Sequence, residues 1–146
     1  MRKFIFAMLA LFSLGTLTVK ADKDYVITTD KLPMKAQQFV KNHFPSIKVS
    51  YIKEERDIFT RNYEILFADG SKAEFARSGE WTEVDCRFSE VPGSVVPAAV
   101  TAYVQEHFPD AKIRKIERER GGYEVRLSNK LELFFNKNLK LRNIDD

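Results

Sequence analysis

Few residues of this chain combine the types and spacing that catalysis requires. Ser50 and Lys53 fit an S-x-x-K pattern, but residues three apart on a strand point to opposite faces, so these side chains cannot meet. His43 and His107 each precede a Phe-Pro pair, and an imidazole at a helix C-terminus caps free carbonyls and is favoured by the helix dipole. The chain has no Walker loop, G-x-S-x-G, H-E-x-x-H or C-x-x-C motif. We therefore expect a protein that is not an enzyme.

Three pairs of acidic residues are candidate metal ligands: Asp22 and Asp24, Glu83 and Asp85, and Asp145 and Asp146. Carboxylate oxygens are the ligands that Ca²⁺ prefers, and extracellular modules bind this ion at millimolar concentrations. No twelve-residue EF-hand loop is present. We expect either no cofactor or a weak calcium site that uses Glu83, Asp85 or Asp145. The charge runs 53–56 and 117–120 carry both signs and indicate a solvated face with cross-strand ion pairs.

Cys86 is the single cysteine, so no intramolecular disulfide can form. Its place on an expected strand predicts a small buried hydrophobe. A reactive thiol or a bridge to another chain is the alternative.

The N-terminus has the features of an export signal. Arg2 and Lys3 precede sixteen uncharged residues, and Val-Lys-Ala at 19–21 gives the small-x-small pattern of a cleavage site. A transmembrane span needs about 20 apolar residues, more than this run provides. We predict a signal peptide over residues 1–21, a mature chain that starts at Asp22 and does not insert into a membrane, and a periplasmic or extracellular location.

Removal of this segment changes the charge. The chain has 24 Lys and Arg against 21 Asp and Glu, a formal net charge of +3. Arg2, Lys3 and Lys20 lie in the predicted signal peptide, which has no acidic residue, so the mature chain is neutral. A neutral surface lacks the counterion release that drives nucleic-acid binding, and we expect no DNA or RNA partner.

One stretch of sequence occurs twice. Residues 33–56 align with residues 97–120 at a constant offset of 64, and nine of the 24 aligned residues are identical, His-Phe-Pro among them. Beyond this stretch the offset falls to 60, so that Tyr63-Glu64 aligns with Tyr123-Glu124. The second copy therefore lacks four residues in one loop.

Each copy predicts one helix followed by strands. A proline suits the first helical turn, apolar residues recur at helical spacing, and the proline of His-Phe-Pro ends the helix. The expected helices run from 33 to 44 and from 97 to 108. Asp69-Gly70, Ser78-Gly79 and Gly121-Gly122 fit two-residue hairpin turns between alternating strands. In the first copy the strands are expected near 47–56, 62–68, 71–77 and 81–88.

These elements predict an α+β fold of two tandem units, each a helix followed by a four-stranded antiparallel meander. The two meanders form one continuous sheet with both helices on one face. The expected units are residues 22–88 and 97–146, with a linker at 89–96 that contains Pro92 and Gly93.

The sequence resembles the PepSY-like, beta-lactamase-inhibitor-protein-like family of small secreted or periplasmic bacterial proteins. The resemblance covers about residues 30 to 146 and depends on the repeated Val-x-x-His-Phe-Pro helix end, the Ile-x-x-Glu-Arg strand and the Tyr-Glu strand. It implies a non-enzymatic module of tandem α-β units with a continuous sheet and a concave binding surface. Inhibition of a β-lactamase or restraint of a secreted peptidase is then an analogy from the fold.

The uncovered sheet face is the expected binding surface. Alternation along the strands places Val84, Cys86 and Phe88 in the core. The same alternation turns outward Leu66, Trp81, Arg87, Arg126 and Phe134. Aromatic and arginine side chains dominate binding hot spots. The alternative for Trp81 is that it covers the end of the sheet, as the aligned Leu141 does in the second unit.

The longer loop of the first unit, 57–62, carries Ile58 and Phe59 at its tip. Large apolar residues at a loop tip indicate a partner or a covering surface. We expect this loop and the open face to form one interface with an unidentified protein. The favoured function is a secreted binding or regulatory module, with inhibition of a secreted enzyme as one form. The alternative is a calcium- or small-ligand-responsive protein of the envelope.

Overall fold

The computed structural model describes residues 23–146. The predicted signal peptide, residues 1–21, lies outside the described residues. The helices are α1 (Met34–His43) and α2 (Ala98–His107), with a 3-10 turn η1 (Thr29–Lys31) before α1. The strands are β1 (Lys23–Ile27), β2 (Val49–Arg56), β3 (Arg61–Phe67), β4 (Lys72–Phe75), β5 (Trp81–Asp85), β6 (Ile113–Glu119), β7 (Gly122–Leu127), β8 (Glu132–Asn136) and β9 (Leu141–Asp145).

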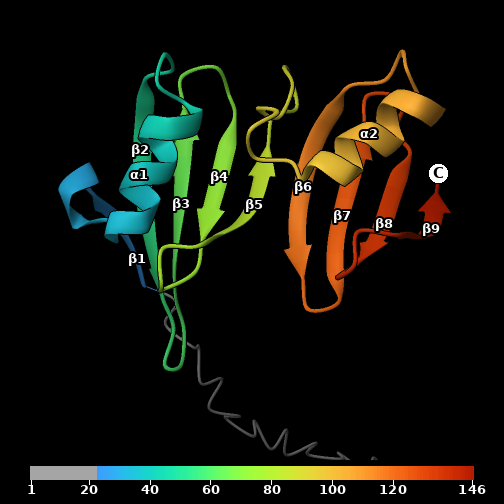
Figure 1. The fold of residues 1–146 in the computed structure, drawn as a ribbon. Helices are drawn as coiled ribbons and strands as arrows, with labels where there is room; N and C mark the ends of the chain where they lie inside the picture. Colours follow the sequence, from blue (N-terminus) through green and yellow to red (C-terminus); the bar gives the residue numbers. More distant parts are fainter. Residues whose placement is uncertain (1–22) are drawn as a thin grey trace, which may run out of the picture.

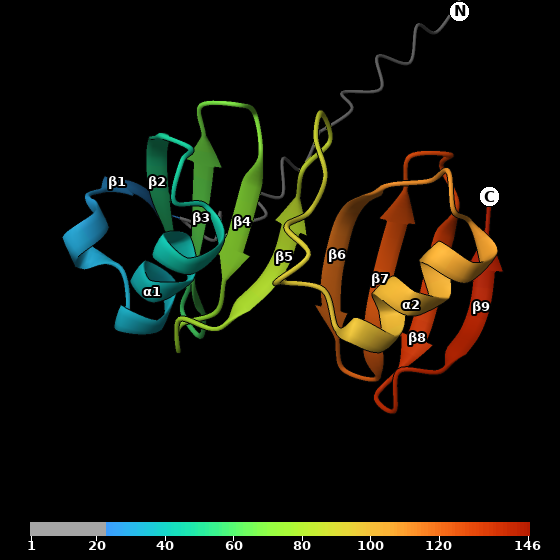
Figure 2. The same cartoon turned by 45° about the horizontal axis from the view of Figure 1, so that its top comes forward.

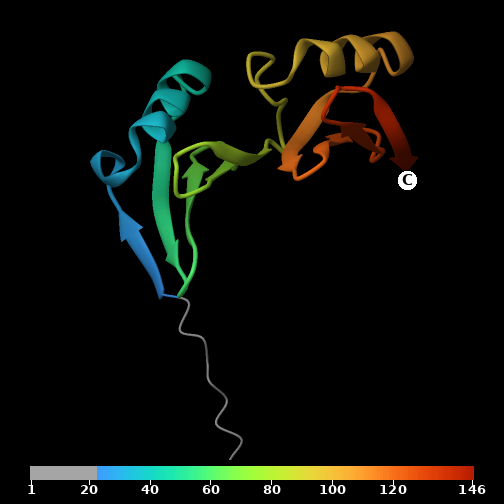
Figure 3. The ribbon, with the colours of Figure 1, turned by 60° about the horizontal axis from the view of Figure 1, so that its bottom comes forward.

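The nine strands form one antiparallel sheet whose spatial order follows the sequence, from β1 at one edge to β9 at the other. Figures 1 and 2 show α1 and α2 on the same side of this sheet. Figure 3 shows α2 above β6–β9 and no helix below them. The predicted α+β class and the continuous sheet are confirmed. Strand β1 was not predicted from the sequence; it precedes the aligned stretch and pairs with β2 as β5 pairs with β6.

A row of apolar side chains crosses the sheet on the helix side. Its members are successive cross-strand partners: Ile27, Ile52, Ile65, Ala73, Val84, Ile116, Val125, Leu133 and Ile144. The seven inner members are at most 2% exposed. Because a slip of one residue would turn a strand's share of this row to solvent, the row fixes the register across the whole sheet.

Each helix begins directly after one proline and ends two residues before the next, close to the boundaries that the sequence predicts. Pro33 and Pro97 occupy the N-cap positions of α1 and α2. At the other ends, the N–H groups of Phe44 and Phe108 donate to carbonyls one turn earlier, at 2.9 and 2.7 Å. The following prolines prevent another helical turn.

Each helix packs on the sheet through an aromatic side chain at the same relative position. The Phe39 ring of α1 lies 5.3 Å from the Phe75 ring, and the Tyr103 ring of α2 lies 5.6 Å from the Phe135 ring, both edge to face. Such pairs add about 0.5–1.5 kcal/mol to the burial of the rings. The helices therefore stabilise one sheet face and leave the other free.

Both histidines end their helices, as predicted, but within residues 23–146 only the His107 ring contacts a backbone carbonyl. His43 Nδ1 lies 2.7 Å from Ser94 Oγ, and His107 Nδ1 lies 3.1 Å from the Tyr103 carbonyl in its own helix. Cys86 is 1% exposed, and burial raises the pKa of its thiol. The prediction of a small buried hydrophobe at this position is confirmed.

Trp81 does not lie on the open face, and its predicted placement there is wrong. A β-bulge in the pairing of β4 with β5 makes Trp81 the partner of Phe75, on the helix side. Its ring lies 6.3 Å from Phe39 and from Tyr123, and the residue is only 8% exposed. The extra residue of the bulge reverses the alternation that the sequence predicts. The alternative, that Trp81 covers the end of the sheet, agrees with this position.

Phe88 is 76% exposed, so its predicted place in the core is also wrong. Strand β5 ends at Asp85, and a hydrogen bond from the Ser89 N–H to the Cys86 carbonyl closes a turn around Phe88. The side chain therefore leaves the sheet before the alternation reaches it.

Candidate functional site

The open face, the sheet side without helices, carries a line of acidic side chains through its centre. On the consecutive strands β3 to β7, the cross-strand partners are Glu64, Glu74, Glu83, Glu117 and Glu124. Neighbouring strands lie about 4.8 Å apart, so this glutamate row spans about 19 Å. Like charges directly opposite one another destabilise a sheet.

Lysines beside the glutamate row offset part of its charge. Lys72 Nζ lies 3.5 Å from a Glu64 carboxylate oxygen. Lys115 Nζ lies 3.1 Å from Glu83 and 3.6 Å from Glu117. Burial alone lowers the pKa of Lys115, but the hydrogen bond and the charge of Glu83 together raise it above its ordinary value. Three of the five glutamates therefore have a cationic partner.

The other two, Glu74 and Glu124, form no ion pair within the described part of the chain. Burial raises the pKa of Glu74, and the carboxylates of Glu83 and Glu64 raise it further. Burial, a hydrogen bond with Glu119 and the surrounding carboxylates raise the pKa of Glu124 to about 7. The Glu124 carboxyl therefore keeps its proton to a higher pH than a free glutamate does, and it favours a cation that replaces this proton.

Glu124 belongs to a compact cluster with Glu117 and Glu119, because one carboxylate oxygen from each lies within 4.8 Å of the other two. Ca²⁺ binds oxygens at 2.3–2.6 Å, so two ligands on opposite sides of the ion are about 5 Å apart. The three carboxylates therefore fit one calcium ion, with waters completing the six to eight ligands that it takes.

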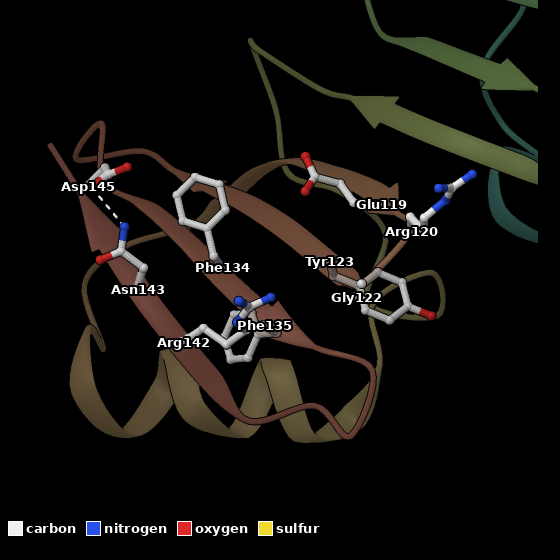
Figure 4. Close-up of a pocket in the computed structure, with 10 residues that line it drawn as sticks. Glu119, Arg120, Gly122, Tyr123, Phe134, Phe135, Arg142, Asn143 and Asp145 are labelled. Carbon is white, nitrogen blue, oxygen red and sulfur yellow. Dashed lines mark hydrogen bonds between the residues drawn. The ribbon is translucent and has the colours of Figure 1, made fainter.

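A cavity of about 470 Å³ adjoins this cluster at the end of the β6–β7 hairpin. Figure 4 shows the Phe134 ring between Glu119 and the pair formed by Asn143 and Asp145, whose side chains share a hydrogen bond of 3.0 Å. The lining also contains Arg120 and Arg142, so the two carboxylates of this cavity, Glu119 and Asp145, are matched by two guanidinium groups.

Several residues predicted for partner binding do reach the open face. Leu66 and Arg126 belong to one line of cross-strand partners beside the glutamate row, and this line also contains Asp85, a predicted metal ligand. Phe134 is the partner of Glu124. Arg87 follows β5 and lies 3.7 Å from Asp85. The structure therefore brings Arg87 and Arg126 to the same region, while Leu66 and Phe134 lie in opposite halves of the sheet.

Ile58 and Phe59 lie at the tip of the β2–β3 hairpin, as predicted, and are 76% and 88% exposed. Figure 1 shows this hairpin extending beyond the end of the sheet. The two side chains are thus on an extension of the sheet rather than on its open face. Their participation in one interface with that face stays a prediction.

The predicted metal ligands Glu83, Asp85 and Asp145 do not form one site. Glu83 and Asp85 lie on β5, and Asp145 lies on β9, four strands and about 19 Å away. No single ion bridges this distance. The acidic cluster that the structure does assemble is that of Glu117, Glu119 and Glu124.

This cluster was not predicted because the charge run 117–120 was interpreted as a solvated face with cross-strand ion pairs. The structure pairs Glu119 with Gly122, so the turn residues are Arg120 and Gly121. This register sets Glu117 opposite Glu124, whereas the predicted Gly121-Gly122 turn does not. Either turn places Glu117, Glu119 and Glu124 on one face of neighbouring strands, and this shared face was the signal for the cluster.

Fold and open face together define the class of this protein: a small α+β protein with a nine-stranded sheet, helices on one face and an acidic uncovered face. The chain belongs to the PepSY-like family. Residues 17–65 and 61–143 match the family described as "Putative beta-lactamase-inhibitor-like, PepSY-like". The predicted resemblance is confirmed.

Solved structures from Bacteroides share this fold. One, from Bacteroides thetaiotaomicron, is described as a "putative calcium-regulated periplasmic protein"; it has 45% identity and a TM-score of 0.82, over 84% of this chain and 97% of that one. A periplasmic protein from Bacteroides vulgatus has 46% identity and a TM-score of 0.82, over 86% and 99%. A second protein from that species has 39% identity and a TM-score of 0.80, over 85% and 100%. A comparison with curated proteins gives no match.

These relatives agree with the predicted location. All three are described as periplasmic, and the chain is a periplasmic protein. Within residues 23–146, neither helix has the length and apolar character needed to cross a membrane. The family and the relatives are inhibitor-like or of unknown function rather than enzyme families.

Proposed function

We propose that this protein is a periplasmic binding module without catalytic activity, and that its open face holds a partner protein with a basic surface. The observation that carries the proposal is the glutamate row, five carboxylates in register on a face that no helix covers. Opposed like charges cost stability in the free protein. A cationic partner removes that cost, so complementary charge provides both affinity and specificity.

Restraint of a secreted enzyme is one form that this binding can take. The inhibitor-like description of the family supports it. The exposed hairpin tip of Ile58 and Phe59 offers an apolar contact beyond the acidic face, and an apolar anchor beside a charged surface is typical of protein interfaces.

The test uses a triple variant that neutralises the row without changing its shape: Glu74→Gln, Glu83→Gln and Glu124→Gln. A matched control removes three charges elsewhere: Glu90→Gln, Glu106→Gln and Asp110→Asn, all exposed residues. Partners captured from a periplasmic extract are quantified by mass spectrometry at low and high salt. We expect a basic protein that binds the wild type and the control, leaves at high salt and does not bind the triple variant. Equal capture by all three proteins would refute the proposal.

The second candidate function is calcium binding. The approach of the Glu117, Glu119 and Glu124 carboxylates to within 4.8 Å favours it, and so does the description of one relative as calcium-regulated. When calcium binds, the ion replaces the proton of Glu124, whose pKa is raised, and the open face loses part of its negative charge.

Isothermal titration with CaCl₂ after removal of metals by EDTA tests this function. We expect saturable binding near millimolar concentrations and a higher melting temperature in the wild type and in Glu106→Gln, and the loss of both effects in Glu119→Gln. No heat and no change in melting temperature in the wild type would exclude the calcium site.

We also propose that the two halves of the chain, 22–88 and 97–146, are tandem copies of one unit. The order of a helix and four strands is the same in both, α1 with β2–β5 and α2 with β6–β9. Both halves have a bulge after the helix, at 49–51 and 113–115, and another before the last strand, at 74–75 and 134–135. Bulges at equivalent positions favour duplication over chance similarity.

A further inference from the structure

A second cavity on the open face has the opposite charge. It has a volume of about 470 Å³ and lies at the ends of β5, β6 and β7. Its lining contains one carboxylate, Asp85, and five cationic side chains: Arg87, Arg114, Lys115, Arg126 and Lys130. We call this cavity the basic pocket. Neither the family nor the relatives' descriptions assign it a role.

A β-bulge concentrates charge at this pocket. The register between β6 and β7 shifts between Ile113 and Lys115, which leaves Arg114 as the extra residue. Bulges re-aim side chains next to binding sites, and here two consecutive residues, Arg114 and Lys115, line the same cavity. The Arg114 guanidinium donates a hydrogen bond to the Ser89 carbonyl, which holds it in place.

Part of the positive charge of the pocket remains free. Lys115, Arg126 and Arg87 approach carboxylates at 3.1, 3.0 and 3.7 Å. Arg114 and Lys130 form no ion pair with any residue of the described part. The pocket therefore has two uncompensated cations, and its three other cations are held in position by their acidic neighbours.

The first half of the chain shows that the fold does not require these charges. The residues aligned with Arg114, Lys115, Arg126 and Lys130 are Ser50, Tyr51, Leu66 and Gly70. The strands there pair in the same way, with Tyr51 opposite Leu66 where the second half has Lys115 opposite Arg126. Four cations gathered in one half alone indicate a ligand.

Lys130 lies at a turn position where the first half has a glycine. Its φ is 72°, and the aligned Gly70 has a φ of 86°. Leu139 replaces the aligned Gly79 in the same way, with a φ of 61°, so the exchange is not specific to the pocket. At Lys130 it adds a cationic side chain to the lining.

We propose that the basic pocket binds a phosphate group. Guanidinium groups form paired hydrogen bonds with the oxygens of a tetrahedral oxyanion, and lysines add charge to the same site. The Ser128 hydroxyl accepts a hydrogen bond of 2.9 Å from the Lys112 N–H, which leaves the hydroxyl hydrogen free to donate to the anion. The proposal is independent of the glutamate row and of calcium. The phosphate is either free in the periplasm or part of a lipid headgroup.

The experiment titrates the protein, purified from the periplasmic fraction, with inorganic phosphate by calorimetry at low ionic strength. The test variant is Arg126→Gln with Lys130→Gln. The matched control is Lys137→Gln with Lys140→Gln, which removes two charges from the exposed β8–β9 turn. Melting curves of both variants establish that they fold, and Lys130→Gln alone serves if the double variant does not. We expect saturable binding to the wild type and the control, and an affinity at least about tenfold lower in the test variant.

A second arm measures co-sedimentation with phosphatidylglycerol vesicles, with phosphatidylcholine vesicles as the neutral comparison. Binding to inorganic phosphate without vesicle binding assigns the pocket to a free phosphate. Vesicle binding that the test variant loses and the control retains assigns it to a headgroup. The proposal is overturned if the wild type binds neither ligand, or if the test and control variants lose binding equally.

Discussion

Replacement of Glu124 by glutamine should stabilise this protein above neutral pH and leave it unchanged in acid. Burial, a hydrogen bond with Glu119 and the neighbouring carboxylates raise the pKa of Glu124 from 4.5 to about 7 in the folded chain. Between these two values the folded state binds more protons than the unfolded state, so the free energy of unfolding falls as pH rises through this window. Glutamine keeps the size of the side chain and removes the charge.

The size of the effect follows from the same pKa values. A rise from 4.5 to about 7 corresponds to at most about 3.4 kcal/mol. Because the side chain is only partly buried, solvent screening reduces this to about 1–2 kcal/mol. With an unfolding entropy of about 2.1 cal/mol/K per residue, the melting temperature of Glu124→Gln should exceed that of the wild type by about 4–8 °C at pH 8.

Thermal unfolding in EDTA at pH 8 and pH 4 measures this difference. The control is Glu106→Gln, an exposed residue on α2. We expect stabilisation by Glu124→Gln at pH 8 alone and no change from the control at either pH. A variant less stable than the wild type at pH 8, or equally stabilised at both values, would show that repulsion within the glutamate row does not act as described.

Three further predictions concern stability and access. Gly122→Ala should lower the free energy of unfolding by more than about 4 kcal/mol in denaturant unfolding, because a Cβ there would lie 1.8 Å from the Phe135 carbonyl oxygen. The control Gly121→Ala should lower it by less than about 1 kcal/mol, because the nearest atom to a Cβ at that position is 3.7 Å away. Trp81→Ala should cost about 3 kcal/mol in the same assay, since the side chain is buried against α1; a change below about 1 kcal/mol would contradict that burial. Cys86 should react with a thiol reagent only after unfolding, because burial raises the pKa of its thiol and excludes the reagent.

The helices and most strands were predictable because their signals are local. A proline before each helix and a His-Phe-Pro at its end set both boundaries within the sequence itself. These signals recur at an offset of 64, so the prediction of one helix supported the prediction of the other. Strand β1 has no such duplicate and no turn residue beside it, which is why it was missed.

The binding face was less predictable because it depends on register. A single bulge moves Trp81 to the helix side, and a turn displaced by one residue hides the pairing of Glu117 with Glu124. Bulges and turn positions leave weak signals in one sequence; a bulge reverses the face of every residue beyond it, and a displaced turn changes the cross-strand partners. Alternation along the strands therefore placed Arg87, Arg126, Phe134 and several of the glutamates on the open face, but the pairing of these glutamates into one row was not foreseen.

The distribution of charge on this face argues for selection on binding rather than on folding. In the helix-side core the two halves carry equivalent apolar residues, since Ile52 and Ile116, or Ile65 and Val125, are interchangeable in packing. On the open face the glutamates continue across the junction of the halves, while four of the five cations of the basic pocket occur in the second half. A folding constraint acts on both halves alike, because their strands pair in the same way. The glutamate row crosses from one half to the other at the expense of stability, and the cations of the basic pocket lie mostly in one half. The fold requires neither feature, whereas binding of a ligand or partner accounts for both.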